Sequence, residues 1–188
     1  MITSLLRDLA GRAPALRELL AASEEEQQAS GYSHTLREIC QQPLTWPATA
    51  ATAEANAPAL RAALAGAAAV VLTGSGSSLY AGECLAPSLR AVLGIPVEAI
   101  GGGDILTHGG ARIPPPRPCL VISLARSGNS PESCGAVDLL LASEPGCRHL
   151  AITCNAEGRL ATSYRGVPSF TSLLLDERTN DRSLVMTS

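Results

Sequence analysis

Residues 69–82 read AVVLTGSGSSLYAG, a short apolar run followed by a turn rich in glycine and serine. The apolar run, Ala69–Thr73, is predicted to be a buried strand, and a helix is expected over Ser78–Leu93. Glycines let the backbone turn tightly and approach a ligand closely. Hydroxyls and free N–H groups at a helix start face one spot, where the helix dipole favours an anion. The segment therefore predicts a strand–turn–helix unit that binds phosphate.

A dinucleotide-binding fingerprint fits this turn less well. The pattern G-x-G-x-x-G requires glycine at its sixth place, where this chain has Leu79. No acidic residue closes the second predicted strand, where a ribose would be bound. A pocket for a small phosphorylated ligand is the better interpretation.

A second loop repeats the arrangement. Residues 123–133 read SLARSGNSPES, in which a strand ends, a glycine-containing turn follows and a helix starts. Ser130 is predicted as the N-cap, with Pro131 as the first helical residue. Ser127 and Asn129 join Ser130 as donors to phosphate oxygens. Serines at helix starts are usually only caps, so each loop alone is weak evidence for a phosphate site. The hypothesis of a phosphate site rests on the two loops together.

Strand-like and helix-like stretches alternate on both sides of these loops. This alternation predicts a three-layer α/β/α fold with a parallel sheet covered on both faces. With the strand order 2-1-3-4-5, the first and third strands are neighbours, so both loops flank the switch point where such sheets bind ligands. The predicted strands are Ala69–Thr73, Val97–Ile100, Cys119–Leu124, His149–Thr153 and Phe170–Leu175, and the helices between them are Ser78–Leu93, Pro131–Glu144 and Glu157–Ser163. Residues 101–118 are expected to be mostly loop, with one helical turn around Asp104–Thr107.

Residues 1–66 are predicted to be a helical extension, followed by the α/β domain at 67–188. Residues 4–28 show leucines at helical spacing, with a division expected at Gly11 and Pro14. Thr35–Glu38 has the form of a capping box, and the helix that it opens is expected to stop near residue 42. Two prolines, Pro43 and Pro47, account for that stop. The alanine-rich residues 48–66 are helical in propensity, with Pro58 marking a second start.

Composition excludes several classes of function. The chain has 188 residues, 46% of them hydrophobic, and a net charge of −3, so it lacks the basic surface of a nucleic-acid or anionic-membrane binder. All 14 basic residues are arginine, which excludes a Schiff-base or P-loop lysine. The six cysteines show no C-x-x-C spacing, so no metal site is predicted. We expect no cofactor, a cytoplasmic location, no signal peptide and cysteines that are small buried hydrophobes.

Four further side chains are interpreted from their positions. His149 opens a strand and is expected to be a structural histidine with its hydrogen bonds satisfied, and His108 is a candidate for the mouth of the site. Cys134 follows the second loop and would be reactive only if exposed. Asp181, beside Arg182, is expected at the surface or capping a terminal helix.

The motifs resemble those of the SIS (sugar isomerase) domain, and most closely its AgaS-type members, described as tagatose-6-phosphate ketose/aldose isomerases or galactosamine-6-phosphate deaminases. The resemblance is carried by VLTGSGSSLYAG at 71–82, ISLARSGNSPES at 122–133, AITCN at 151–155 and DERTNDRSLVMTS at 176–188. An upstream E-I-x-x-Q-P-x-x-W pattern is matched by Glu38, Ile39, Gln42, Pro43 and Trp46.

The resemblance implies a set of ligand-binding residues. By position, phosphate would be bound by Ser77, Ser78, Arg126, Ser127 and Ser130. Gly76 and Asn129 are expected at the pocket rim. Asn155 ends the fourth predicted strand at the same sheet edge, which is compatible with a place at the rim or with a role in the turn. Ala125 stands where many members have the first serine of the second turn, so one hydroxyl donor is absent.

The resemblance also implies what this chain lacks. AgaS-type proteins resemble a tandem of two SIS domains, and in related isomerases a glutamate base, a ring-opening histidine and a lysine lie in the second half. We therefore expect the chain to be the first half, with its catalytic residues elsewhere, ending inside a helix begun by Asn180 or Asp181. Its partner would be a second SIS domain or another copy of the chain.

Three functions remain open at this point. The first is the phosphosugar-binding half of an isomerase or deaminase acting on sugar 6-phosphates. The second is a sensor of sugar phosphates, which the acidic N-terminal residues disfavour because known sensors carry a basic helix-turn-helix there. The third is an inactive truncation. If the chain alone turned over substrate, Glu83 or Glu132 would be the first candidates for the base.

Overall fold

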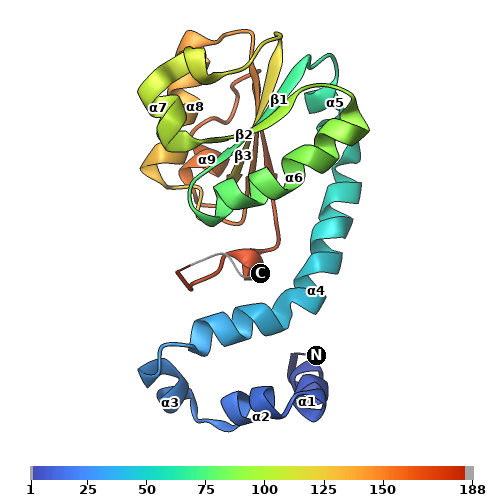
Figure 1. Ribbon diagram of the computed structural model, residues 1–188, viewed down its shortest axis with the longest axis vertical. Coiled ribbons are helices and arrows are strands. Elements are labelled where there is room, and N and C mark those ends of the chain that lie inside the picture. Colours follow the sequence, from blue (N-terminus) through green and yellow to red (C-terminus); the bar gives the residue numbers. More distant parts are fainter. Residues whose placement is uncertain (1, 185–188) are drawn as a thin grey trace.

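The computed structural model describes residues 2–184, with side chains from residue 6 onward. Figure 1 shows an α/β body from which an arm of helices extends, with the segment after β5, up to residue 184, lying between the body and the arm. A long helix, α4 (Ser33–Ala55), runs from the tip of the arm to the body.

The body is built on a parallel sheet. Its strands are β1 (Ala69–Gly74), β2 (Val97–Gly101), β3 (Cys119–Ala125), β4 (Arg148–Thr153) and β5 (Phe170–Leu174). They lie in the order β2-β1-β3-β4-β5, and every neighbouring pair is parallel. All strands are predicted correctly to within one or two residues, and the predicted order is confirmed.

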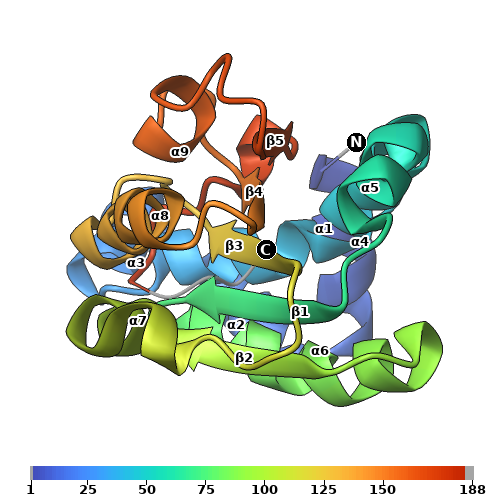
Figure 2. The same cartoon turned by 90° about the horizontal axis from the view of Figure 1, so that it is seen from above.

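Helices cover both faces of this sheet (Figure 2). One face packs against α5 (Ala57–Leu64) and α6 (Ser77–Leu93) through Val70, Leu72 and Leu120. The other face packs against α7 (Gly102–His108), α8 (Pro131–Ser143) and α9 (Arg159–Thr162) through Val71, Val121 and Ala151. Because alternate strand residues point to opposite faces, a continuous apolar run supplies both cores. The three-layer α/β/α fold is therefore confirmed.

The helical extension differs from its prediction in where the helices end. Its first part forms α1 (Ile2–Arg12), α2 (Pro14–Ala21) and α3 (Glu24–Ala29), so the division near Pro14 is confirmed. The capping box lies at Ser23 and Glu26, which cap α3, and not at Thr35 and Glu38, which are inside α4.

The expected stop at Pro43 and Pro47 is wrong, because α4 continues through both prolines. Figure 1 shows the helix changing direction along its length. Proline removes a backbone donor and crowds the preceding turn, which kinks a helix that packing holds together. The start of α5 beside Pro58 is confirmed. The boundary at residue 66 stays a prediction, and α5, which precedes it, packs on the sheet.

The segments that follow β2 and β5 also differ from expectation. Residues 102–112 are not mostly loop, since α7 is followed directly by a 3₁₀ helix, η1 (Gly109–Arg112). No helix begins at Asn180 or Asp181 within the described residues; a short 3₁₀ helix, η2 (Glu177–Thr179), precedes them instead. Residues 185–188 of the expected terminal helix lie outside the described residues.

Three side-chain expectations are wrong. Cys84 is exposed, whereas the other five cysteines are buried free thiols. Asp181 is buried and not a surface residue. His149 is buried, but among the described residues neither ring nitrogen finds a hydrogen-bond partner. Within residues 2–184, none of the helices combines the length and apolar character that crossing a bilayer requires.

Candidate functional site

A cavity of about 360 Å³ lies at the carboxyl edge of the sheet, where β1 leads into α6 and β3 leads into α8. These two strands are neighbours, with Thr73 aligned to Ser123, so the loops that follow them meet. The volume falls in the range of small-molecule pockets, about 300–1,000 Å³. The cavity is lined by Ser75, Gly76, Ser77, Ser78, Tyr80, Leu124, Ala125, Arg126, Ser127, Ser130, Ser133 and Leu184.

The first loop depends on two glycines. Gly76, the N-cap of α6, has φ +56° and ψ −126°, a conformation that residues with a side chain rarely adopt. A Cβ on Gly74 would lie 2.6 Å from the Cβ of Ser78, so the end of β1 packs closely on the first turn of α6. These glycines bring Ser77 and the buried Ser78 to the cavity at the positive end of a helix.

The second loop is organised by its own hydroxyls. Ser130 caps α8, accepting from the Ser133 N–H at 3.3 Å and donating to the Ser133 hydroxyl at 2.7 Å. The Ser127 hydroxyl accepts from the Asn129 N–H at 3.3 Å. Two helix N-termini with their hydroxyls therefore converge on one cavity, and both have partial positive charge.

Arg126 is the only charged residue among the described residues that line the cavity. One of its guanidinium nitrogens donates to the carbonyl of Ser183 at 2.6 Å. A permanent cation beside hydroxyls and helix N-termini favours an anion in the cavity, and a phosphate oxygen suits all of these donors.

The structure places all five predicted phosphate ligands and Gly76 in this cavity, but not the other two rim residues. The Asn129 side chain accepts from the Arg159 N–H at 2.8 Å. Asn155 donates to the carbonyl of Ser127 at 3.0 Å and accepts from the Glu157 N–H at 3.0 Å. Both asparagines therefore hold the second loop against the turn before α9.

The candidate acid–base groups lie elsewhere. Glu83 and Glu132 are exposed, and His108 is exposed with its ring 3.1 Å from the Asp104 carbonyl. The described lining contains no carboxylate and no imidazole. Cys134, just behind the second loop, is buried, and burial raises the pKa of its thiol. Glu83, Glu132 and His108, the acid–base candidates singled out from the sequence, therefore lie outside the described cavity lining.

Sequence reasoning did not select Ser75, Tyr80, Ser133 or Leu184 as lining residues. Ser75 and Ser133 belong to the same serine-rich loops, so the loop composition was the available signal. Leu184 belongs to the segment after β5, far from both loops in the sequence, and no local pattern predicts that it lies beside them.

Taken together, the fold and the site define a doubly wound α/β domain whose cavity, lined by hydroxyls and one arginine, lies at its topological switch point. No family model matches the chain. A Streptomyces coelicolor protein with the name AgaS is 41% identical over 160 residues, covering 82% of this chain and 42% of the relative. The D-galactosamine-6-phosphate deaminase AgaS of a Shewanella species is 38% identical over 184 residues, covering 90% of this chain and 46% of that protein.

A solved structure agrees with these relatives. The crystal structure of tagatose-6-phosphate ketose/aldose isomerase from Escherichia coli superimposes with a TM-score of 0.77 at 35% identity, covering 85% of this chain and 44% of that one. The chain therefore contains an SIS domain of the AgaS type. It spans just under half the length of the relatives that it matches.

Proposed function

We propose that this chain is the phosphosugar-binding part of an aldose–ketose isomerase or amino-sugar-phosphate deaminase that acts on sugar 6-phosphates, such as galactosamine 6-phosphate and tagatose 6-phosphate. The observation that carries the proposal is the convergence of Ser77, Ser78, Ser127, Ser130 and Arg126 on one cavity. The names of the relatives supply the class of substrate.

In this proposal the chain holds the phosphate end of the substrate. The first turns of α6 and α8 provide hydroxyl and N–H donors, and Arg126 provides a fixed positive charge. Binding the phosphate, which does not react, would place C1 and C2 of the sugar at a defined distance from the loops. The family's chemistry is ring opening followed by proton transfer between C2 and C1.

The groups that move those protons are proposed to lie outside this chain. The described lining has no carboxylate or histidine, and general acid–base groups typically contribute about 10²–10⁴-fold each. We therefore expect ligand binding without measurable isomerase or deaminase turnover from residues 1–188 alone. The free thiols of all six cysteines are consistent with our proposal that the protein works in the reducing cytoplasm.

Calorimetric titration of the chain with galactosamine 6-phosphate and tagatose 6-phosphate tests this function. Each hydroxyl-to-phosphate bond is worth roughly 1.5–3 kcal/mol, so Ser78→Ala and Ser127→Ala should each weaken binding several-fold or more. Ser143→Ala is the matched control, because that hydroxyl lies on α8 but donates to the Leu139 carbonyl away from the cavity. Galactosamine without phosphate should not bind.

Two results would contradict the proposal. If neither phosphosugar binds the wild-type chain, the cavity is not a phosphosugar site. If the wild-type chain converts either substrate at an enzymatic rate, the division between binding and catalysis is wrong.

A further inference from the structure

The end of the chain is held by a buried carboxylate of the helical extension. Glu38 on α4 is 5% exposed. It accepts from the Arg182 N–H at 2.6 Å, from the Ser183 N–H at 3.1 Å and from the Ser183 hydroxyl. A buried carboxylate is costly unless several donors satisfy it, and bonds to a charged acceptor are among the stronger ones. This carboxylate therefore specifies where residues 182 and 183 lie.

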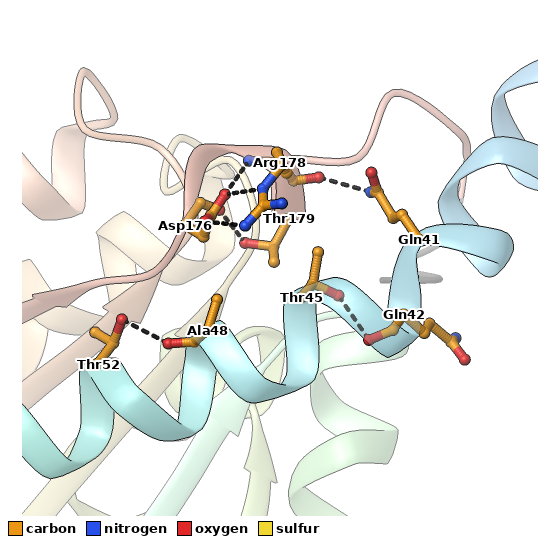
Figure 3. Close-up of polar contacts among 8 residues, drawn as sticks. All are labelled: Gln41, Gln42, Thr45, Ala48, Thr52, Asp176, Arg178 and Thr179. Carbon is orange, nitrogen blue, oxygen red and sulfur yellow. Dashed lines mark hydrogen bonds and ion pairs between the residues drawn. The ribbon is translucent and has the colours of Figure 1, made fainter. Parts of the chain in front are cut away.

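A second contact from the same helix face supports the same segment. Gln41 lies three residues after Glu38, so the two side chains share one face of α4. Its amide nitrogen donates to the carbonyl of Arg178 at 2.8 Å, as Figure 3 shows. Thr45, one further turn along, is fully buried near η2. We call Glu38 and Gln41 the α4 clamp, and residues 176–184 the tail.

The tail also contacts the cavity. Ser183 gives its N–H and hydroxyl to Glu38, while its carbonyl accepts from Arg126 at 2.6 Å. Arg126 lines the cavity, and so does Leu184, the next residue of the tail. A continuous chain of contacts thus runs from Glu38 through Ser183 to the one cation of the described lining.

We propose that Glu38 is a positioning residue for the phosphosugar site, acting through the tail on Arg126. An arginine side chain has many rotamers, and ordering it during binding costs free energy. Because the tail carbonyl holds the guanidinium at the cavity before a ligand arrives, the α4 clamp lowers that cost. The inference rests on the proposed function, since it assigns the clamp to the same site.

The test compares Glu38→Ala with Glu38→Gln in the full 188-residue chain. Glutamine keeps one oxygen for the two backbone N–H groups, and its amide can donate to the Ser183 hydroxyl, so it should restore the clamp. We expect Glu38→Ala to bind galactosamine 6-phosphate about tenfold more weakly, and Glu38→Gln to stay within about threefold of wild type. Hydrogen exchange of the tail should rise in Glu38→Ala only.

Glu26→Ala is the matched control. It removes the same charge from the same extension, where Glu26 caps α3 without contacting the tail. It should leave ligand affinity unchanged. In an Arg126→Ala background, Glu38→Ala should weaken binding no further, because Glu38 acts through that arginine. An effect that is merely structural would persist in that background.

The outcomes separate this inference from the function on which it rests. If wild type binds neither phosphosugar nor inorganic phosphate, the proposed function fails and this inference fails with it. If wild type binds and Glu38→Ala binds equally well, only the positioning role is overturned. If Glu38→Ala does not fold, Gln41→Leu replaces it: several-fold weaker binding supports the clamp, and unchanged affinity overturns it.

Discussion

At the scale of single residues, His149 combines complete burial with unsatisfied polar atoms. Its side chain on β4 is 2% exposed and stacks on Phe170, with ring centroids 6.2 Å apart. Among the described residues neither ring nitrogen has a partner, and burial lowers its pKa to about 4. The imidazole is therefore held neutral and loses the hydrogen bonds that water gives it in the unfolded chain.

This burial predicts a loss of stability in mild acid. The pKa of His149 falls from 6.5 in the unfolded chain to about 4 in the folded one, so as the pH drops through this window only the unfolded state binds the proton. The full shift corresponds to roughly 3 kcal/mol. Urea denaturation between pH 7.5 and pH 4 should show wild type losing stability relative to His149→Leu, so that the difference in their free energies of unfolding changes steadily as the pH falls.

The pH window in which His149 affects stability is separate from that of Asp176. Arg178 holds the pKa of Asp176 down to about 2, from 3.8, so the stability from that ion pair is lost only below the histidine's window. If the free energies of unfolding of wild type and His149→Leu change with pH in parallel above pH 4, His149 is not held neutral by burial.

At the scale of elements, the junction between β1 and α6 is determined by backbone conformation. Gly76 has a positive φ, yet a Cβ at that position would meet no atom within 4 Å. Any penalty for a side chain there is therefore a penalty of backbone strain and not of crowding. The same junction aims the N–H groups of α6 at the cavity, so its conformation matters both for stability and for the site.

Gly76→Ala should consequently destabilise the chain by about 1–3 kcal/mol and weaken phosphosugar binding. Gly103→Ala serves as the control, since that glycine has open space around it and an ordinary φ. Because Gly103 lies inside α7, alanine there should be neutral or stabilising by up to about 1 kcal/mol. Chemical denaturation and calorimetry measure both effects, and equal stabilities for the two variants would refute the strain argument.

At the scale of the whole molecule, two helices carry large apolar side chains on the surface. Trp46 on α4 is 62% exposed and Val92 on α6 is 81% exposed, and Ile39, Tyr80 and Leu85 are exposed on the same two helices. Exposed apolar surface marks an interaction site more often than a free face when it is extensive. The relatives are about twice as long as this chain, which is consistent with a partner domain that covers such a surface.

We therefore expect the isolated chain to self-associate. Sedimentation velocity over a range of concentrations should show dimers or larger species, and Leu85→Glu with Val92→Glu should shift the distribution toward monomer. A wild-type chain that sediments as a clean monomer at high concentration would contradict this expectation. A double variant that associates as wild type does would exclude the α6 surface.

Much of the fold and of the candidate site could be predicted because the signals are local. The strand at Ala69–Gly74 opens with the apolar run Ala69–Leu72, and Ser130 followed by Pro131 is a typical start of a helix. Two such units on neighbouring parallel strands must present their loops at one edge, so Ser77, Ser78, Ser127 and Ser130 reach the same cavity. Short-range backbone preference and side-chain alternation carry that information.

Other features depend on contacts between distant residues. Local preference ends a helix at Pro43, but α4 continues because Glu38, Gln41 and Thr45 are buried on its inner face. The hydrogen-bond partner of Gln41 in the tail lies 137 residues further along the chain, and the two backbone partners of Glu38 lie 144 and 145 residues away. Contacts between residues so far apart leave no periodic pattern in the sequence. The position of the tail at the cavity, the role of Glu38 and the burial of Asp181 could therefore be recognised only from the tertiary structure. The free energy of packing, summed over many such contacts, outweighs the cost of a proline inside a helix or of a buried carboxylate. A local sequence pattern indicates that cost but not the distant contacts that offset it.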